Sequence, residues 1–323
     1  MIRTRTILAA LALCGACATP RSAAPAKGEP PPAFAWELKR GGQVLYVAGS
    51  VHLGKAGALP LTPAMEGALS SSDALVVEVD AAKVDQAGLQ GLIVSAGFLP
   101  EGEDLYAMLT PDDRAELARR FQAAGVAPAA AKRMRPWLAS IMLIGLEAAK
   151  SGYQSEGGVD QQLAARARGE KKQIVELESA ESQIRILANL PEHVAALMLE
   201  EMLRNRDAVD QSIGALADAW RRGDAQAMDA LVNADLRKPE YAELYAKLIL
   251  ERNLRMADRI EELLQKPGRY FVVVGAAHVV GERGIVELLR ARGFTVRQLG
   301  QGEPPPPRSS RAAPVTAPGA GPA

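Results

Sequence analysis

Cysteine is almost absent from this sequence of 323 residues, and the two that occur, Cys14 and Cys17, both lie near its start. The rest of the chain therefore cannot form a disulfide bond and offers no thiolate to a metal ion. A metal site there would have to use histidine and carboxylate ligands. Histidine is also scarce, with three in the whole chain. A sequence motif shared by two of these three histidines is therefore not expected to arise by chance.

Net charge and aromatic side chains are missing as well. The 38 basic and 38 acidic residues cancel, which leaves no overall field to draw the protein to nucleic acid. Aromatic residues make up only 4% of the chain, which is little for stacking on bases. Nucleic acid is therefore not an expected partner, and the balanced composition is typical of a soluble globular protein.

No apolar run is long enough to span a bilayer, and the stretch from Ile7 to Ala16 is far too short. Because basic residues precede it and small residues follow it, this stretch is typical of a secretory signal peptide over residues 1–18, cleaved after Ala18. The alternative is lipidation, since the preceding segment loosely resembles a bacterial lipobox with Cys17 as the acceptor. We expect an exported, periplasmic protein that is soluble or held to the membrane only through a lipid at Cys17.

Composition divides the remaining chain into three parts. Residues 19–33 form a linker rich in proline and alanine, and residues 301–323 form a proline-rich tail that is expected to be disordered. Residues 34–300 are expected to fold as one domain.

This central part predicts an α/β protein. Short runs of β-branched and aromatic residues predict strands, and longer stretches with apolar residues at helical spacing separate them. We therefore expect a central mixed sheet flanked by helices, with a large helical insertion. The expected strands are 34–39 paired as a hairpin with 44–48, then 74–80, 171–178, a fully covered central strand at 270–274, and an edge strand at 294–296.

Two expected helices carry details that the structure can test. Thr62 is expected to cap a helix over residues 60–72. In the helix expected over residues 240–265, Asn253 and Leu254 share a buried face. A buried amide needs partners, so Asn253 is either structural or part of a site.

Two of the three histidines follow the same pattern. Gly49-Ser50-Val51-His52 ends one expected strand, and Gly275-Ala276-Ala277-His278 ends another. Gly49 and Gly275 let the backbone turn tightly where a side chain would obstruct it. The third histidine, His193, lies beside charged residues and is expected to be an ordinary surface residue.

Two other expected strands end in carboxylates, Glu78 and Glu178. Ligands and catalytic groups gather at the carboxyl ends of strands in open α/β sheets. If these strands are neighbours, Glu78 and Glu178 should therefore meet His52 and His278.

Simpler roles remain open for the acidic residues. Asp80, Asp160 and Glu178 are expected to support the site. Glu78 and Asp80 could instead be solvated residues at the end of a strand, and Glu178 could support the start of the helix that follows. Asp160 follows two glycines, so it could be a helix N-cap or part of the site.

Two imidazoles beside carboxylates suit a divalent ion such as Zn, Mn or Co. Such an ion lowers the pKa of a bound water and polarises a carbonyl, and a nearby glutamate can then act as the general base. The sequence contains neither the His-Glu-x-x-His motif of a zincin nor the Gly-x-Ser-x-Gly motif of a serine hydrolase.

Taken together, these motifs resemble the TraB/GumN family, which is related to the Tiki proteases. Each Gly-x-x-His motif alone is weak, but the ordered set is specific and covers nearly the whole expected domain. The matching segments are Tyr46 to His52, Val76 to Asp80, Gly158 to Asp160, Leu177 to Ser179 with Gln183, Glu251 to Asn253, and Val274 to His278 with Gly281 and Gly284.

The resemblance implies an α/β fold like that of erythromycin esterase and the haem-binding lipoprotein ChaN. In Tiki proteins the paired motifs and an acid between them support metal-dependent proteolysis. The resemblance therefore implies that His52, Glu78 and His278 form the site and bind the metal, with Arg252 and Asn253 as polar supports.

The preferred hypothesis is a metal-dependent hydrolase of the cell envelope, with a peptidase as the leading candidate, that acts on a peptide or another small substrate. The alternatives are a non-catalytic protein that binds a ligand such as haem, and a structural partner in envelope or polysaccharide export. Sequence leaves the substrate, the metal and the oligomeric state open.

Overall fold

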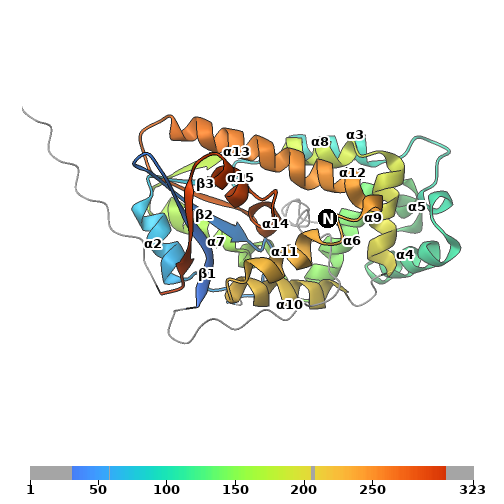
Figure 1. Cartoon of the computed structure of the whole chain (residues 1–323). Helices are drawn as coiled ribbons and strands as arrows, with labels where there is room; N and C mark the ends of the chain where they lie inside the picture. Colours follow the sequence, from blue (N-terminus) through green and yellow to red (C-terminus); the bar gives the residue numbers. More distant parts are fainter. Residues whose placement is uncertain (1–30, 58, 205–207, 303–323) are drawn as a thin grey trace, which may run out of the picture.

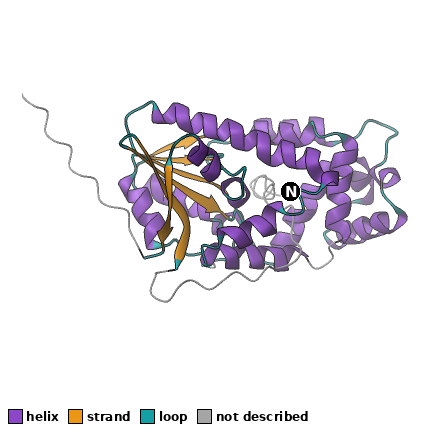
Figure 2. Ribbon diagram, viewed as in Figure 1, coloured by secondary structure: helices purple, strands orange, loops and turns teal. Residues whose placement is uncertain are grey.

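The structure is a computed structural model that describes residues 31–57, 59–204 and 208–302 (Figure 1). The expected signal peptide, nearly all of the linker and most of the tail lie outside the described residues. A six-stranded mixed sheet forms one end of the described molecule, and helices make up most of the rest (Figure 2). The α/β fold predicted from the sequence is confirmed.

The sheet joins an antiparallel hairpin to a parallel core. In chain order, the strands are β1 (Pro32–Arg40), β2 (Gln43–Ser50), β3 (Ala74–Val77), β4 (Gln173–Glu176), β5 (Tyr270–Gly275) and β6 (Thr295–Gly300). The order across the sheet is β4-β3-β5-β2-β1-β6. β5 pairs in parallel with both β2 and β3, and all its residues are buried, as its unbroken apolar run predicts. The carboxyl ends of β2, β5 and β3 therefore lie side by side.

The hairpin forms where the sequence predicts it. β1 and β2 pair antiparallel, and the turn residues Gly41 and Gly42 both have positive φ, as a tight two-residue turn requires. β6 pairs antiparallel with β1 at the edge of the sheet, which confirms the edge strand and extends it to Gly300.

Two strands are shorter than the sequence predicts. β3 ends at Val77 and β4 at Glu176, so Glu78 and Glu178 lie in the connections after the strands. The Glu178 N–H still donates to the Glu78 carbonyl at 2.9 Å, which holds these two connections side by side. At the other end of β4, Lys171 has a positive φ of 56°, so it cannot belong to the strand.

The longer helices flank the sheet and extend well beyond one end of it (Figure 1). They are α2 (Pro63–Ser71), α3 (Gln86–Gly97), α4 (Pro111–Ala123), α5 (Pro128–Arg133), α6 (Pro136–Lys150), α7 (Val159–Gly169), α8 (Ala180–Ala188), α9 (Glu192–Arg204), α10 (Ala208–Arg221), α11 (Ala225–Asn233), α13 (Glu251–Leu264) and α15 (Ile285–Ala291). Thr62 caps α2 by accepting a hydrogen bond from the Met65 N–H, as predicted. Among the described residues, no helix is both long and apolar enough to cross a membrane.

The prediction of a single helix over residues 240–265 is wrong. A 3₁₀ turn (Pro239–Tyr241), the short helix α12 (Ala242–Tyr245) and a π-helical turn (Ala246–Leu250) precede α13. The buried face of α13 includes Asn253, which is 1% exposed, whereas Leu254 is 40% exposed. The sequence pattern placed both on one face, but the π-helical turn before α13 breaks the helical register, and the buried face of α13 runs through Arg252, Asn253, Met256 and Ala257 instead.

An ion-pair network lies between α4 and the end of α9. Arg120 is 8% exposed, donates to Glu116 at 2.7 Å and Glu147 at 2.8 Å, and also binds the Leu203 carbonyl of α9 at 3.1 Å. The hydrogen bond from Arg119, aided by Arg120 and opposed by burial, lowers the pKa of Glu116 from 4.5 to about 2. Glu116 therefore stabilises the fold above pH 4.5 and loses this contribution as the pH falls towards 2.

We expect Glu116→Gln to lower the free energy of unfolding by about 2 kcal/mol at neutral pH, because hydrogen bonds to charged groups contribute about this much. The variant should also lose less stability than the natural protein between pH 4.5 and pH 2, because glutamine does not titrate. Urea unfolding at several pH values measures both effects. Glu287→Gln is the control, since Glu287 makes an exposed ion pair with Arg290. If the natural protein and Glu116→Gln lost equal stability between pH 4.5 and pH 2, ionised Glu116 would not be what stabilises the fold in this range.

Candidate functional site

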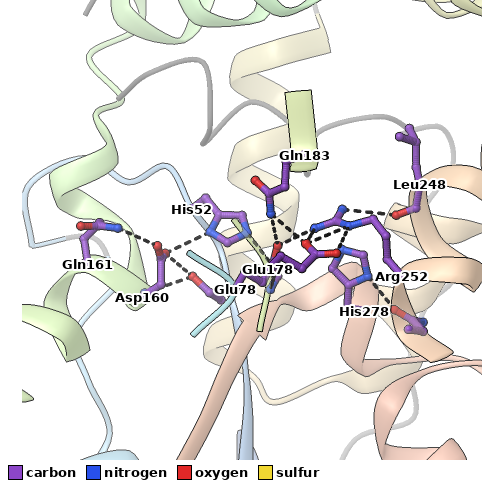
Figure 3. Close-up of polar contacts among 12 residues, drawn as sticks. His52, Glu78, Asp160, Gln161, Glu178, Gln183, Leu248, Arg252 and His278 are labelled. Atoms are coloured by element: carbon purple, nitrogen blue, oxygen red, sulfur yellow. Dashed lines mark hydrogen bonds and ion pairs between the residues drawn. The ribbon is translucent and has the colours of Figure 1, made fainter. Parts of the chain in front are cut away.

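Residues far apart in the sequence meet at the carboxyl ends of the parallel strands (Figure 3). His52 follows β2, Glu78 follows β3, Glu178 follows β4, and His278 lies on the short helix α14 (Ala276–Val279) directly after β5. The convergence expected from the strand ends therefore occurs, because β2, β5, β3 and β4 are consecutive neighbours in the sheet.

Glu78 lies at the centre of this group and is 8% exposed. Its Oε1 accepts a hydrogen bond from the Gly275 N–H at 2.5 Å and lies 3.8 Å from His52 Nε2. Its Oε2 accepts from Arg252 at 2.7 Å and from Gln183 at 3.1 Å. Burial opposes ionisation, but His278 and Arg252 outweigh it and lower the pKa of Glu78 to about 2. Glu78 is therefore an ionised carboxylate at neutral pH.

Arg252 joins the two glutamates. It comes from the first turn of α13 and its side chain is 3% exposed. Its Nη2 donates to Glu178 Oε2 at 2.6 Å as well as to Glu78, and its Nε donates to Glu178 at 3.0 Å. Its Nη1 binds the Leu248 carbonyl in the preceding π-helical turn at 3.3 Å. The π-helical turn thus supplies an acceptor for the guanidinium, which in turn compensates two buried negative charges.

Glu178 does not support the start of α8, which was its simpler expected role. Ser179 and Ser182 cap α8 reciprocally, each side chain bonding the backbone N–H of the other. Glu178 is left to bind Arg252 and Gln183. Gln183 was noted in the sequence only as part of a matching segment, but its amide bridges Glu78 and Glu178. Its place one turn into the helix that follows a strand end is the signal that could have identified it.

His52 is oriented by Asp160. The carboxylate of Asp160 lies 3.1 Å from His52 Nδ1 and accepts a hydrogen bond from Ser50 Oγ at 2.5 Å. Gly158 is the N-cap residue of α7, so the simpler expectation that Asp160 caps this helix is wrong. A Cβ at Gly158 would collide with the His52 carbonyl, and this contact explains why a glycine brings α7 so close. Burial alone would lower the pKa of His52, but Asp160 and Glu78 raise it to about 9.

His278 is oriented by Asn253. The ring Nδ1 lies 2.6 Å from Asn253 Oδ1, while Asn253 Nδ2 donates to the Arg283 carbonyl at 2.8 Å. Because Asn253 presents its oxygen, Nδ1 carries the ring proton and Nε2 keeps its lone pair. Burial and the nearby Arg252 lower the pKa of His278 to about 4, so the ring is neutral at physiological pH.

Both motif glycines are needed for close packing. A Cβ on Gly275 would lie 2.7 Å from His52 Nε2, 3.2 Å from Glu78 Oε1 and 3.6 Å from His278 Cδ2. Gly275 therefore lies within the group formed by these three side chains. A Cβ on Gly49 would overlap the ring of Phe34.

Asp80 does not join the group. Its carboxylate pairs with Arg168 and, at 3.6 Å, with Lys83, while its N–H donates to Glu176 at 2.8 Å. Asp80, expected as a supporting residue, therefore lies outside the group, because β3 ends before Asp80 and the alternation of a strand no longer sets its direction. His193 is exposed on α9, as expected for a surface residue.

The donors at the site have the chemistry of a metal site, although their positions are not those of an assembled one. Across the described ranges, no group of three or more His, Cys, Asp and Glu residues is placed to hold a metal ion. Each of the two imidazoles, however, has its Nδ1 engaged by an acceptor, which is how metal-binding histidines are usually oriented. His278 Nε2 and Glu78 Oε1, together with His52 Nε2 once the His52 ring is deprotonated, are the atoms that would hold a divalent ion.

An α/β sheet with a Gly-x-x-His motif at the carboxyl end of each of two adjacent parallel strands defines the class of protein. The chain belongs to the TraB/PrgY/gumN family, whose model matches residues 34–298. The resemblance noted in the sequence is thereby confirmed.

Relatives of two kinds match the chain. The protein named "Uncharacterized protein YbaP" from Escherichia coli (strain K12) is 29% identical over 77% of this chain and 89% of its own length. Its Shigella flexneri counterpart is 30% identical over 76% of this chain and 87% of its own length. A protein named "Metalloprotease TIKI homolog" from Amphimedon queenslandica is 38% identical over 68 residues, which is 20% of this chain and 13% of that protein. No solved structure matches.

Proposed function

We propose that this protein is a metal-dependent hydrolase of the cell envelope that cleaves peptides. The observation that carries the proposal is the arrangement around Gly275, where His52, Glu78 and His278 meet and each imidazole is held through its Nδ1. The name of the matching TIKI homolog, a metalloprotease, supports the same activity. A bound divalent ion would activate a water molecule and polarise the carbonyl of the substrate.

Glu78 was expected to act either as a metal ligand or as a general base, and its surroundings favour the role of ligand. A general base works best when its pKa is near the working pH. The pKa of Glu78 is about 2, and three donors already bind its oxygens. We therefore assign Glu78 to metal binding and charge compensation, and not to proton abstraction. Asp160 and Ser50 orient His52, and Asn253 orients His278.

Measuring metal content and peptide cleavage on the purified full-length protein tests this proposal. Metal-free protein should take up Mn, Co or Zn, and only the loaded protein should cleave members of a peptide library, as detected by mass spectrometry. His193→Ala, which alters an exposed histidine, should retain both properties. A haem absorption band together with no divalent-ion uptake would instead favour the ligand-binding alternative.

We further propose that the protein is exported and resides in the periplasm, either soluble or tethered by a lipid at Cys17. Mass spectrometry of the mature N-terminus from the native host tests this. A free Thr19 supports simple cleavage, and a diacylglyceryl group on Cys17 supports the tether. An intact Met1 would contradict both.

Gly275→Ala should reduce metal binding and hydrolysis by roughly 10-fold or more, since small misplacements of catalytic groups have large effects. The added methyl group would lie 2.7 Å from His52 Nε2, so the ring must move. The backbone at Gly275 has a φ of −52°, which alanine tolerates, so the fold should persist. Gly91→Ala is the control, because its Cβ would have no neighbour within 4 Å. Unchanged metal affinity in Gly275→Ala would argue against a shared site at this glycine.

A further inference from the structure

Two helices between β4 and β5 each bind one of the two Gly-x-x-His segments, residues 49–52 and 275–278, which we call the histidine turns. Trp220, near the end of α10, donates from Nε1 to the Gly49 carbonyl at 2.8 Å. Asn233, the last residue of α11, donates from Nδ2 to the Ala277 carbonyl at 3.3 Å. Both side chains are buried, with exposed fractions of 2% and 1%. One acceptor opens the first Gly-x-x-His motif, and the other directly precedes the histidine of the second.

The turn between these helices is fixed to the sheet. Gly223 has a positive φ of 62°, and a Cβ there would collide with the Pro32 carbonyl of β1. Gln298 of β6 donates to the carbonyls of Gly223 at 2.7 Å and Ala33 at 2.9 Å. At its turn the helix pair therefore packs against β1 and is hydrogen-bonded to β6, and it contacts the histidine turns through Trp220 and Asn233.

The amide of Asn233 is itself oriented. Its Nδ2 also donates to Asp229 Oδ1 at 3.0 Å, and Arg237 binds both oxygens of Asp229 at 3.0 Å. This arrangement directs the Asn233 amide before it meets the Ala277 carbonyl. Trp220 needs no neighbouring side chain to orient its polar group in this way, because an indole N–H can only donate.

We infer that the α10–α11 pair sets the relative position of the two histidine turns, with Trp220 and Asn233 as positioning residues. Neither side chain is among those that would hold the metal, so both act through backbone carbonyls. The inference bears on catalysis only if the proposed function is right, but the positioning itself does not depend on it. Since a shift of about 1 Å at a catalytic group can lower the rate about 10²-fold, single hydrogen bonds at such places have large functional effects.

The imidazole NMR signals of the three histidines report directly on the position of the two histidine turns. The imidazole nitrogens of His52, His193 and His278 can be resolved by ¹⁵N NMR of the full-length protein, with exposed His193 as the internal reference. Trp220→Phe keeps an aromatic ring but removes the donor, and it should shift the His52 signals. Asn233→Ala should shift the His278 signals. Gln298→Ala, which releases the turn of the helix pair, should shift both sets, and His193 should stay unchanged in all three.

Tyr241→Phe is the matched control. It also removes one hydrogen bond from an aromatic side chain among the helices, the 2.8 Å bond from Tyr241 Oη to Glu201. This variant should leave the His52 and His278 signals unchanged. In a peptide-cleavage assay, Trp220→Phe and Asn233→Ala should lower kcat by roughly 10-fold or more with KM unchanged, whereas Tyr241→Phe should not.

Each outcome either supports or overturns the positioning role of the α10–α11 pair. The inference is overturned if Trp220→Phe and Asn233→Ala, folded by circular dichroism, keep natural His52 and His278 signals, or if Tyr241→Phe shifts those signals equally. If one positioning variant does not fold, the other and Gln298→Ala still provide the test. Shifted imidazole signals in a protein that binds no metal and cleaves no peptide would sink the proposed function and leave the positioning role intact.

Discussion

Replacing His52 or His278 by alanine is expected to abolish metal binding and hydrolysis, and the double variant should be no worse than either single one. The two rings lie near Gly275 and the same carboxylate, Glu78, so they should act as one unit. Effects of residues that act as a unit are strongly non-additive. Metal analysis and peptide cleavage of the three variants measure this.

Glu78→Gln extends the same test. If Glu78 is a ligand, as its donors and low pKa favour, the variant should lose the ion along with activity. If it were a general base, the ion would stay and turnover would fall by roughly 10²-fold or more. His193→Ala again serves as the control. Full metal occupancy and full activity in His52→Ala would reduce the two motifs to loop histidines without a shared function.

Arg252→Met is expected to lower the free energy of unfolding by about 3–5 kcal/mol, because removing one partner of a buried ion pair leaves uncompensated charge. Here two carboxylates, Glu78 and Glu178, would lose the same guanidinium. Urea denaturation at neutral pH measures the loss. Arg255→Met is the matched control on the same helix, since Arg255 is about half exposed and makes only a surface pair with Glu251.

A second substitution separates charge from packing. Adding Glu178→Gln to Arg252→Met removes one of the two unpaired carboxylates, so the double variant should recover part of the lost stability. No recovery would mean that the loss arises from the packing of the long side chain. Equal losses in Arg252→Met and Arg255→Met would refute the view that the buried pair matters for folding.

The parts of the site that the sequence predicted are those fixed by strand geometry. Parallel neighbours end at the same edge, so a histidine after β2 and another after β5 approach each other if the two strands are neighbours, which the structure shows. The apolar run of β5 and the glycine turns made both strands recognisable. Helical periodicity had already marked Asn253 as a buried amide, and family resemblance added Arg252. No local pattern could have tied these two residues to Glu78 and His278.

What the sequence could not predict depends on contacts between distant segments. Glu78 and Asp80 look equivalent in an alternating strand, but β3 ends at Val77, and Asp80 then pairs with Arg168. Likewise, helical periodicity put Leu254 on the buried face because it does not register a π-helical turn. Trp220 had no signal at all, since its partner is a carbonyl provided by another part of the chain.

The position of β5 has a consequence for how the protein is made. β5 fills the gap between β2 and β3, yet more than half of the chain separates it from β2. During synthesis both earlier strands must wait with unpaired edges until nearly the whole polypeptide has emerged. Such edges invite pairing with other chains, and long-range parallel pairing is slow. Nascent or truncated chains that stop before Tyr270 should therefore be prone to aggregate and should depend on chaperones.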